Sequence, residues 1–515
     1  MARLEKVPTI VLAAIVAMLP FELRTFPIIS NLQWLFVAIA LASVPLLYRE
    51  RYRLLRHRLV ITAAVFVFMQ GAAALAAVEF RPNAAKGAIR VAAGFVLFCI
   101  VLCIRNRDSL MRIWCVAAGA AALYGLADYA GLGVPDLFRT AEFYFIDVLR
   151  LSGSFEYPNT AAAFFAMSLP IVWLTPRNVS VRFATSALVL VALFLTYSRG
   201  AVVALALMVL AWAVAGGSKD ALSLGGLGAG LYMALAVVQP FLIQRLRQPQ
   251  PDKALAADYN PDFNLMHHRP REMGELKVTI RNTGSAVWFP DGSMPVTLSY
   301  HWYDTDRQRL ATVAVSEPPL PQAVRPGESV SVNASFSTPY EPGHYLLIWD
   351  LAQKGRGWFS ANGVVPGIVE SDIQQENEIR YGKGDVSHWL RVEKAADATV
   401  TRGLLWRAAL RLAVRNPILG AGPDNFRLLY GRVLEFSSWD TNIRANSLYL
   451  ELLVGSGVLG LLAFILMIVS IPRHINVATL SIGVFLIHGI ADVFLMTTPI
   501  YFAFWILMGF AEKDI

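Results

Sequence analysis

The chain has 515 residues, a formal net charge of +8, 56% hydrophobic residues and a mean hydropathy of +0.50. It is too apolar for a soluble globule, because its apolar residues come in long blocks and not in periodic stripes. The basic surplus is explained by membrane orientation, so no nucleic-acid partner is expected. The chain is therefore predicted to be a polytopic α-helical membrane protein in contact with membrane lipids.

About twelve apolar runs are long enough to be membrane-spanning helices, since a crossing takes about 20 residues. Nine precede residue 245 and three follow residue 445. The first is not a removable signal peptide, because Pro20-Phe21-Glu22 offers no small-residue cleavage site. The runs cover residues 8–23, 30–48, 59–78, 87–104, 112–131, 160–175, 183–198, 200–216, 221–243, 447–471, 475–496 and 498–512.

The Lys and Arg residues of the short loops predict the orientation. Fifteen fall on the side of the N-terminus and at most seven on the other side. Both termini are therefore expected in the cytoplasm, and the large block between the ninth and tenth runs is expected on the outer side. This layout gives helices one to nine in residues 1–244 and helices ten to twelve in residues 446–515.

The outer block divides into three parts. Residues 245–273 are rich in Pro, Gln and Asp and predict a linker, whereas residues 274–365 alternate in short apolar and polar runs. The latter pattern indicates an antiparallel β-sandwich, and it resembles the immunoglobulin-like modules found beside carbohydrate-active proteins. Because the only cysteines, Cys99, Cys103 and Cys115, lie in or beside apolar runs, no disulfide is expected in this block.

Residues 366–445 predict a helical segment that covers the mouth of the helix bundle. Trp406 to Val414 has helical apolar spacing, and the Pro417 to Pro423 turn follows it. Such an amphipathic helix would lie on the outer leaflet or over the bundle.

Two metal-like motifs have ordinary explanations. Asp304-Thr-Asp306 falls at an expected hairpin turn, where these residue types are common. The adjacent His267 and His268 have no partner ligands at useful spacing and are assigned to the linker. No metal site is expected.

Several arginines lie close to the predicted membrane-spanning runs, where a charged side chain is costly and is often functional. Arg150 lies in an expected outer loop and Arg199 at an outer turn, with Arg81 and Arg90 near the start of the fourth run. A guanidinium binds phosphate oxygens in pairs and stays charged near lipid, so these residues could hold a diphosphate. Anchoring of helix ends by snorkelling is an equal alternative for Arg150 and Arg199.

Four motifs in order resemble the O-antigen ligase and O-antigen polymerase superfamily. They are Arg150 with Ser152-Gly153 and Pro158-Asn159; Ser198-Arg199-Gly200; Arg402 with Trp406, Pro417, Gly420, Gly422 and Phe426; and Leu448 to Leu453 with Gly455, Gly457 and Gly460. The similarity covers residues 80–512 apart from the sandwich.

The resemblance implies a metal-independent, inverting membrane glycosyltransferase of the GT-C type that needs no cofactor. Its donor would be an undecaprenyl-diphosphate-linked oligosaccharide at the periplasmic face of the bacterial inner membrane. Arg150 and Arg199 would act on the diphosphate and are the first catalytic candidates. Further substrate-binding candidates are Arg81, Arg90, Asn159, Arg402, Arg444 and Tyr449.

One position departs from the ligase pattern. The family histidine three residues before Tyr449 is replaced by Asn446, which can orient a hydroxyl group but cannot take its proton at neutral pH. His488, expected to share a helix face with Asp492, and Asp440 are candidate substitutes. Glu451 is a further carboxylate near Asn446.

The acceptor decides which reaction is carried out. A second lipid-linked glycan makes the protein an O-antigen or exopolysaccharide repeat-unit polymerase, whereas a lipid A core makes it an O-antigen ligase. The missing histidine favours the polymerase slightly. A glycan transporter is the alternative from another class, but the nine-and-three division of the runs shows no related halves. A third alternative is a sensor or scaffold protein that binds glycan through the sandwich.

Overall fold

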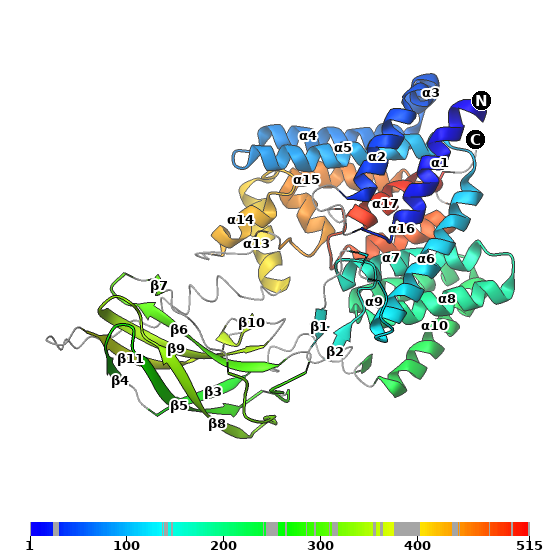
Figure 1. Ribbon diagram of the computed structural model, residues 1–515. Coiled ribbons are helices and arrows are strands. Elements are labelled where there is room, and N and C mark those ends of the chain that lie inside the picture. Colours follow the sequence, from blue (N-terminus) through cyan, green and yellow to red (C-terminus); the bar gives the residue numbers. More distant parts are fainter. Residues whose placement is uncertain are drawn as a thin grey trace.

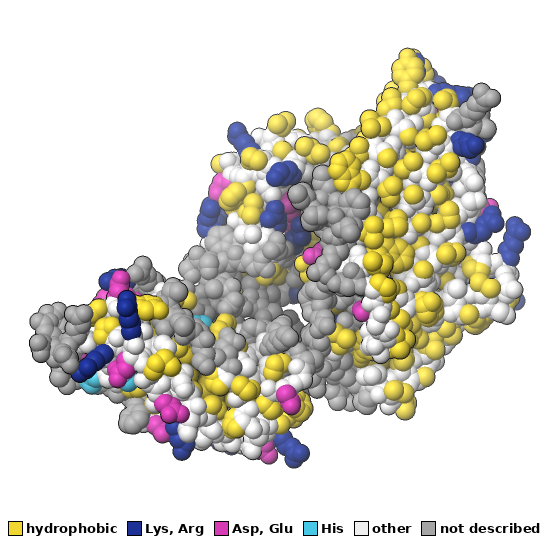
Figure 2. Space-filling model, viewed as in Figure 1, with side chains coloured by type: hydrophobic (Ala, Val, Ile, Leu, Met, Phe, Trp, Pro, Cys, Tyr) yellow, Lys and Arg dark blue, Asp and Glu magenta, His cyan; other side chains and the backbone are white. Residues whose placement is uncertain are grey.

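The computed structural model shows a helical body and a body of β-sheets (Figure 1). Figure 2 shows hydrophobic side chains spread over a broad face of the helices, while many charged side chains lie over the sheets. The structure describes residues 2–23, 30–135, 137–138, 143–145, 148–239, 242–243, 256–262, 265–284, 286–292, 295–307, 309–311, 318–353, 357–360, 364–374, 402–434, 441, 443–472, 474–495 and 498–512.

Each predicted apolar run contains a helix. Five described helices are long and apolar enough to cross a membrane: α4, α5, α6, α10 over Lys219–Val238, and α15. The bent pair α2 and α3 adds a sixth if it is one span, and α7, α8, α9, α16 and α17 are shorter apolar helices. The bounds are α1 (Ala2–Met18), α2 (Asn31–Ala42), α3 (Val44–Arg56), α4 (Arg58–Ala76), α5 (Arg81–Cys103), α6 (Arg107–Tyr129), α7 (Pro158–Leu174), α8 (Val179–Leu195), α9 (Arg199–Val214), α10 (Ser218–Val238), α13 (Arg402–Arg415), α14 (Phe426–Val433), α15 (Leu448–Val469), α16 (Val477–His488) and α17 (Thr498–Phe510).

The second run is not one straight helix. α2 ends at Ala42 and α3 leaves it at an angle of 72° after Ser43. Pro45 lies in the first turn of α3, where a backbone N–H would have no intrahelical partner, so its absence costs nothing. In a helix continuous from α2 to α3, the same proline would remove a hydrogen bond. The single span predicted over residues 30–48 is therefore broken.

α5 and α17 approach each other closely at a glycine. A Cβ atom at Gly94 would overlap the indole ring of Trp505 and crowd the hydroxyl of Tyr501. That hydroxyl donates a hydrogen bond to the carbonyl of Arg90, one turn earlier in α5. The glycine therefore allows the contact that holds the Arg90 backbone against α17.

The described β-strands of the second body form two sheets. One has the order β4-β11-β9-β6-β7 with β10 on β9, and the other has the order β3-β5-β8. All pairs are antiparallel except β4 with β11. The bounds are β3 (Ala257–Pro261), β4 (Leu265–His268), β5 (Met273–Asn282), β6 (Val296–Asp304), β7 (Arg309–Ala311), β8 (Ser329–Ser337), β9 (Gly343–Gln353), β10 (Gly357–Trp358) and β11 (Gly367–Ile373).

One hydrophobic cluster lies between the two sheets. It includes Trp302 and Trp349 from the larger sheet and Phe336 from the smaller one, all buried. Along β8 the buried and exposed residues alternate, as the period of a strand with one solvated face requires. The alternating runs of the sequence thus fold as two packed sheets.

Two predicted boundaries differ from the structure. β3 and β4 lie in the segment expected to be a linker, and β11 lies at the start of the segment expected to be helical. β3 is fixed from outside: the Tyr259 hydroxyl donates to a carboxylate oxygen of Asp350 at 2.9 Å and accepts from the N–H of Leu351 at 3.0 Å. Such partners leave no local signal in a sequence rich in Asp and Pro.

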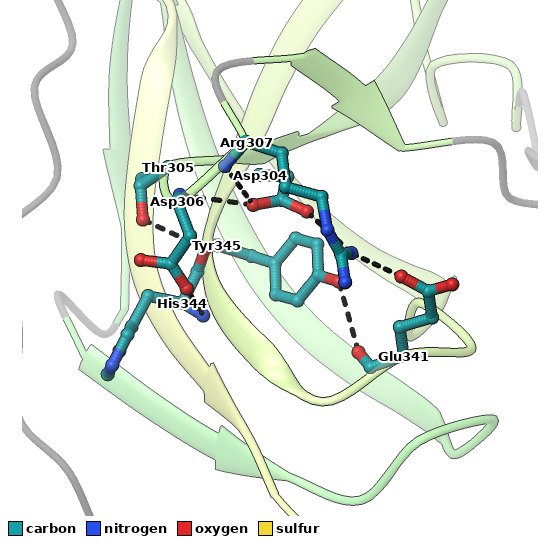
Figure 3. Close-up of polar contacts among 7 residues, drawn as sticks. All are labelled: Asp304, Thr305, Asp306, Arg307, Glu341, His344 and Tyr345. Carbon is teal, nitrogen blue, oxygen red and sulfur yellow. Dashed lines mark hydrogen bonds and ion pairs between the residues drawn. The ribbon is translucent and has the colours of Figure 1, made fainter.

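The two metal-like motifs take structural roles. The Asp304 carboxylate accepts hydrogen bonds from the N–H groups of Asp306 and Arg307 at 3.0 and 2.9 Å, which holds the turn between β6 and β7 (Figure 3). Arg307 also pairs with Asp304 and with Glu341. His267 and His268 lie in β4 and not in a linker. Among the described residues, no three His, Cys, Asp or Glu side chains gather as a metal site.

We expect Gly94→Ala to destabilise the helical body by about 2 kcal/mol, because the added methyl group must displace α17. Gly71→Ala in α4 is the matched control, since a Cβ atom there meets nothing within 4 Å and alanine favours a helix. Thermal unfolding of the detergent-solubilised protein measures both. Equal melting temperatures for the two variants would contradict the close approach.

Asp350 should make the stability of the sandwich depend on pH. Burial raises its pKa to about 6, whereas the unfolded chain has the ordinary value of about 4. As pH rises from about 4 to about 6, Asp350 loses its proton in the unfolded chain but keeps it in the folded protein. The free energy of unfolding therefore falls over this range, by up to about 1.4 kcal/mol per pH unit.

Asp350→Asn should remove this slope. Burial lowers the pKa of His301 to about 4, which produces an opposite slope as pH falls below about 6.5, but that contribution is the same in both proteins. Hydrogen exchange of the β9 amides in the whole protein, corrected for intrinsic rates, gives the difference. Parallel pH profiles for the two proteins would show that Asp350 does not titrate in this range.

Candidate active site

Arg150 links the end of α8, the start of α7 and, through Asn159, the segment after α16. It ends β2 (Val148–Arg150), which pairs with β1 (Phe143–Phe145). Its Nε donates to the Thr196 carbonyl at 2.8 Å, and its Nη2 donates to Oδ1 of Asn159 at 2.8 Å. Asn159 in turn donates through Nδ2 to Oδ2 of Asp492 at 3.1 Å. The ends of α8 and α7 and the segment after α16 therefore meet at one guanidinium group.

The loop after Arg150 is fixed by close backbone packing. The N–H of Leu151 donates to the Leu195 carbonyl at 2.9 Å. Gly153 has a φ of +58°, and a Cβ atom there would come within 3.0 Å of Gly125 in α6. Only glycine fits both the left-handed backbone and this contact, so the Ser152-Gly153 motif sets the position of Arg150.

Two further arginines lie near Arg150. Arg199 begins α9 directly after Tyr197, whose φ is +52°. The charge of Arg402, at the start of α13, acts on Arg150, Arg199 and Asp492. Burial lowers the pKa of Arg150 to about 10, so it remains protonated at neutral pH. We call Arg150, Arg199, Arg402, Asn159 and Asp492 the Arg150 group.

His488 lies beside this group in an apolar setting. It is 2% exposed, its ring centroid is 4.6 Å from that of Phe494, and a Cβ atom at Gly200 would come within 3.0 Å of its ring. Its Nδ1 is buried and has no hydrogen-bond partner among the described residues. α16 ends at His488, so Asp492 lies beyond the helix and the predicted shared helix face is wrong.

A second group of charges surrounds Asp424. Its Oδ2 accepts from Nε of Arg427 at 3.1 Å, and its Oδ1 lies 3.4 Å from Nη2 of Arg444. The charges of all three residues act on Arg90 in α5. We call Arg90, Arg427, Arg444 and Asp424 the Arg90 group. Each of the two groups thus contains three arginines and one aspartate.

The turn that carries Asp424 is wedged between helices. The amide of Asn425 bonds the carbonyls of Ala421 and Glu79, and Asn83 of α5 donates to the Asp424 carbonyl and to Oδ1 of Asn425. Gly87 makes room for Pro423, since a Cβ atom there would lie 2.9 Å from the proline ring. Asp424 itself has a φ of +61°. The carboxylate is thus held by the surrounding backbone.

Asn446 lies on the segment between the two groups. Its φ is +48°, its carbonyl accepts from Nε1 of Trp406 at 3.3 Å, and the preceding Ala445 N–H donates to Oε2 of the buried Glu451 at 3.0 Å. Leu448 N–H donates to the Asp492 carbonyl at 3.0 Å. From Arg444 to Leu448 the chain can span at most about 14 Å, so the two groups are near neighbours.

The remaining predicted residues lie elsewhere or take other contacts. Nε of Arg81 donates to the Ala77 carbonyl at 2.7 Å, and the Tyr449 hydroxyl donates to the Leu486 carbonyl at 2.8 Å. Asp440 lies outside the described residues. Arg427 was missed, although its i+3 spacing from Asp424 is a visible ion-pair signal. The contact of Glu451 with Ala445 was missed as well.

Residues 358–465 match the model of a protein family described as O-antigen ligase. This segment is similar to the O-antigen ligase family. The match confirms the predicted superfamily, and it includes Arg402, Asp424, Arg444 and Asn446. The match, together with the apolar helices, supports a multi-pass membrane protein that acts on lipid-linked glycans, with ligase-type or polymerase-type activity. A search of curated proteins finds no match to the chain.

Proposed function

We propose that the protein is a glycosyltransferase that moves a glycan from undecaprenyl diphosphate to an acceptor hydroxyl group. The reaction takes place at the periplasmic face of the bacterial inner membrane, with both termini in the cytoplasm. The observation that supports this proposal most directly is the Arg150 group. Arg150 bonds Asn159, which bonds Asp492, and the charge of Arg402 acts on Arg150, Arg199 and Asp492.

The charge of the Arg150 group suits a leaving diphosphate. Its three guanidinium groups outnumber its one carboxylate, and Arg150 is partly buried. When the acceptor oxygen attacks the anomeric carbon, the bond to the diphosphate oxygen breaks and its electron pair leaves with the diphosphate. Preformed donors that face this developing charge lower the barrier without reorganising. Attack from the opposite side inverts the anomeric centre.

Asn446 is proposed to orient the acceptor hydroxyl group. Its left-handed backbone is held by Trp406 and by the contact of Glu451 with Ala445. Its side-chain amide has no hydrogen-bond partner within the described part of the chain, which leaves it available for a substrate. Because an amide takes no proton at neutral pH, leaving-group stabilisation and positioning must carry the reaction.

A repeat-unit polymerase is the preferred activity, because Asn446 replaces the histidine of the ligase pattern. The second candidate is an O-antigen ligase that uses lipid A core, which the description of the matching family favours. In either case the sandwich is proposed to guide the glycan.

Reconstitution with an undecaprenyl-diphosphate-linked repeat unit tests the function. A ladder of longer glycans without added core supports the polymerase, and a product that requires lipid A core supports the ligase. Wild-type protein that forms no product with either acceptor would exclude the glycosyltransferase.

Arg150→Gln should reduce the transfer rate by about 100-fold or more, because one donor to the developing charge is lost. Arg432→Gln is the matched control, since this exposed arginine pairs with Glu79 at 2.7 Å and belongs to neither arginine group. Its rate should stay within about twofold of the wild type. Equal rates for the two variants would remove Arg150 from the site.

Asn446→His should add a pH dependence that the wild type lacks. Histidine tolerates the left-handed backbone, and its imidazole group can act as a base until it is protonated. The rate of this variant should fall below about pH 6.5, while the wild type and Asn446→Ala show no step there. The pH profile of transfer measures this. A flat profile for the histidine variant would place residue 446 away from the acceptor hydroxyl.

A further inference from the structure

We infer that the Arg90 group is a second anion site, which binds the phosphate or diphosphate group of the acceptor while the Arg150 group holds that of the donor. The assignment to an acceptor rests on the proposed function. The existence of the site rests on charge and hydrogen bonding within the group itself.

The Arg90 group has more positive than negative charge. Three guanidinium groups surround the one carboxylate of Asp424, and even an ionised Glu451 would leave them in excess. Arg90 is half-buried within α5, one of the membrane-capable helices. Charge at such a position is costly unless it is paired or serves a ligand.

Arg427 is occupied by structural contacts. Its Nε pairs with Asp424, its Nη1 donates to the Thr441 carbonyl at 3.0 Å, and its Nη2 donates to Oδ1 of Asn83 at 2.6 Å. This arginine therefore compensates most of the charge of Asp424. Within the described part of the chain, Arg444 is then left with only a long contact to Asp424.

Arg444 has unused donor capacity. Its nearest approach to Asp424 is 3.4 Å, which is long for a hydrogen bond between charged groups. Its Nε is buried and has no acceptor among the described residues. An incoming phosphate would supply that acceptor, because a guanidinium edge bonds two phosphate oxygens at once.

The two arginine groups are separate and adjacent. They share no residue, each contains its own aspartate, and the segment from Arg444 to Leu448 connects them. Two anions can therefore bind at the same time on either side of Asn446. A reaction that joins two lipid-linked glycans brings two diphosphates together in this way.

Calorimetric titration of the whole protein in detergent with inorganic pyrophosphate tests the site. We expect two binding sites in the wild type and in the control Arg432→Gln. Arg150→Gln should lose one site. Arg444→Gln and Arg90→Gln should each weaken the other site by about tenfold or more. A single site in the wild type overturns the inference, as does a site in Arg150→Gln that Arg444→Gln and Arg90→Gln leave unchanged.

Competition in Arg150→Gln identifies the source of the anion. Displacement of pyrophosphate by farnesyl diphosphate supports a lipid-linked acceptor, whereas displacement by glucose 1-phosphate alone supports a phosphorylated sugar. Displacement by neither shows an adventitious anion and overturns the inference. Wild-type protein that binds two pyrophosphates without transferring glycan would overturn the proposed function. Protein that transfers glycan but binds one pyrophosphate would overturn only the second site.

Discussion

The helical body must hold guanidinium groups beside hydrocarbon, and the contacts of Arg150 show how it does so. Thr196 is the C-cap of α8, so its carbonyl belongs to the helix end that lacks an intrahelical donor and carries partial negative charge. Nε of Arg150 satisfies that carbonyl. The same guanidinium fixes the amide of Asn159, which fixes Asp492. The end of α8, the start of α7 and the segment after α16 are therefore linked through one partly buried cation.

Local patterns in the sequence predicted much of the fold. Apolar blocks predicted a helix within every run, because each block reflects an environment without water. Alternation of period two predicted the strands around Trp302, Phe336 and Trp349, since each strand has one buried face. Arg150, Asn159 and Arg402 became candidate site residues through the resemblance to family motifs and not through periodicity.

Features that depend on distant partners could not be predicted. β3 owes its place to contacts of Tyr259 with β9, and its own composition indicates a linker. α16 ends at His488, and Asp492 lies beyond it. The carbonyls of Gly489 and Asp492 both accept from the N–H of Leu448, which is distant in sequence. The Arg90 group needs a left-handed backbone at Asp424 and a partner in α5 far along the chain. Only the bend at Ser43 had a visible cause, in Pro45.

The hydrophobic cluster of the sandwich contains no residue of the described helices, and this separation bears on how the chain folds. α15 packs against α4, and Gln70 donates to Ser456 across 386 residues of sequence. Closing so long a loop from a flexible chain slows folding and costs entropy. A sandwich that folds first on its own cluster shortens the effective loop by the length of the segment from β3 to β11. Folding of the inserted sheets would then speed the docking of the last helices onto the first.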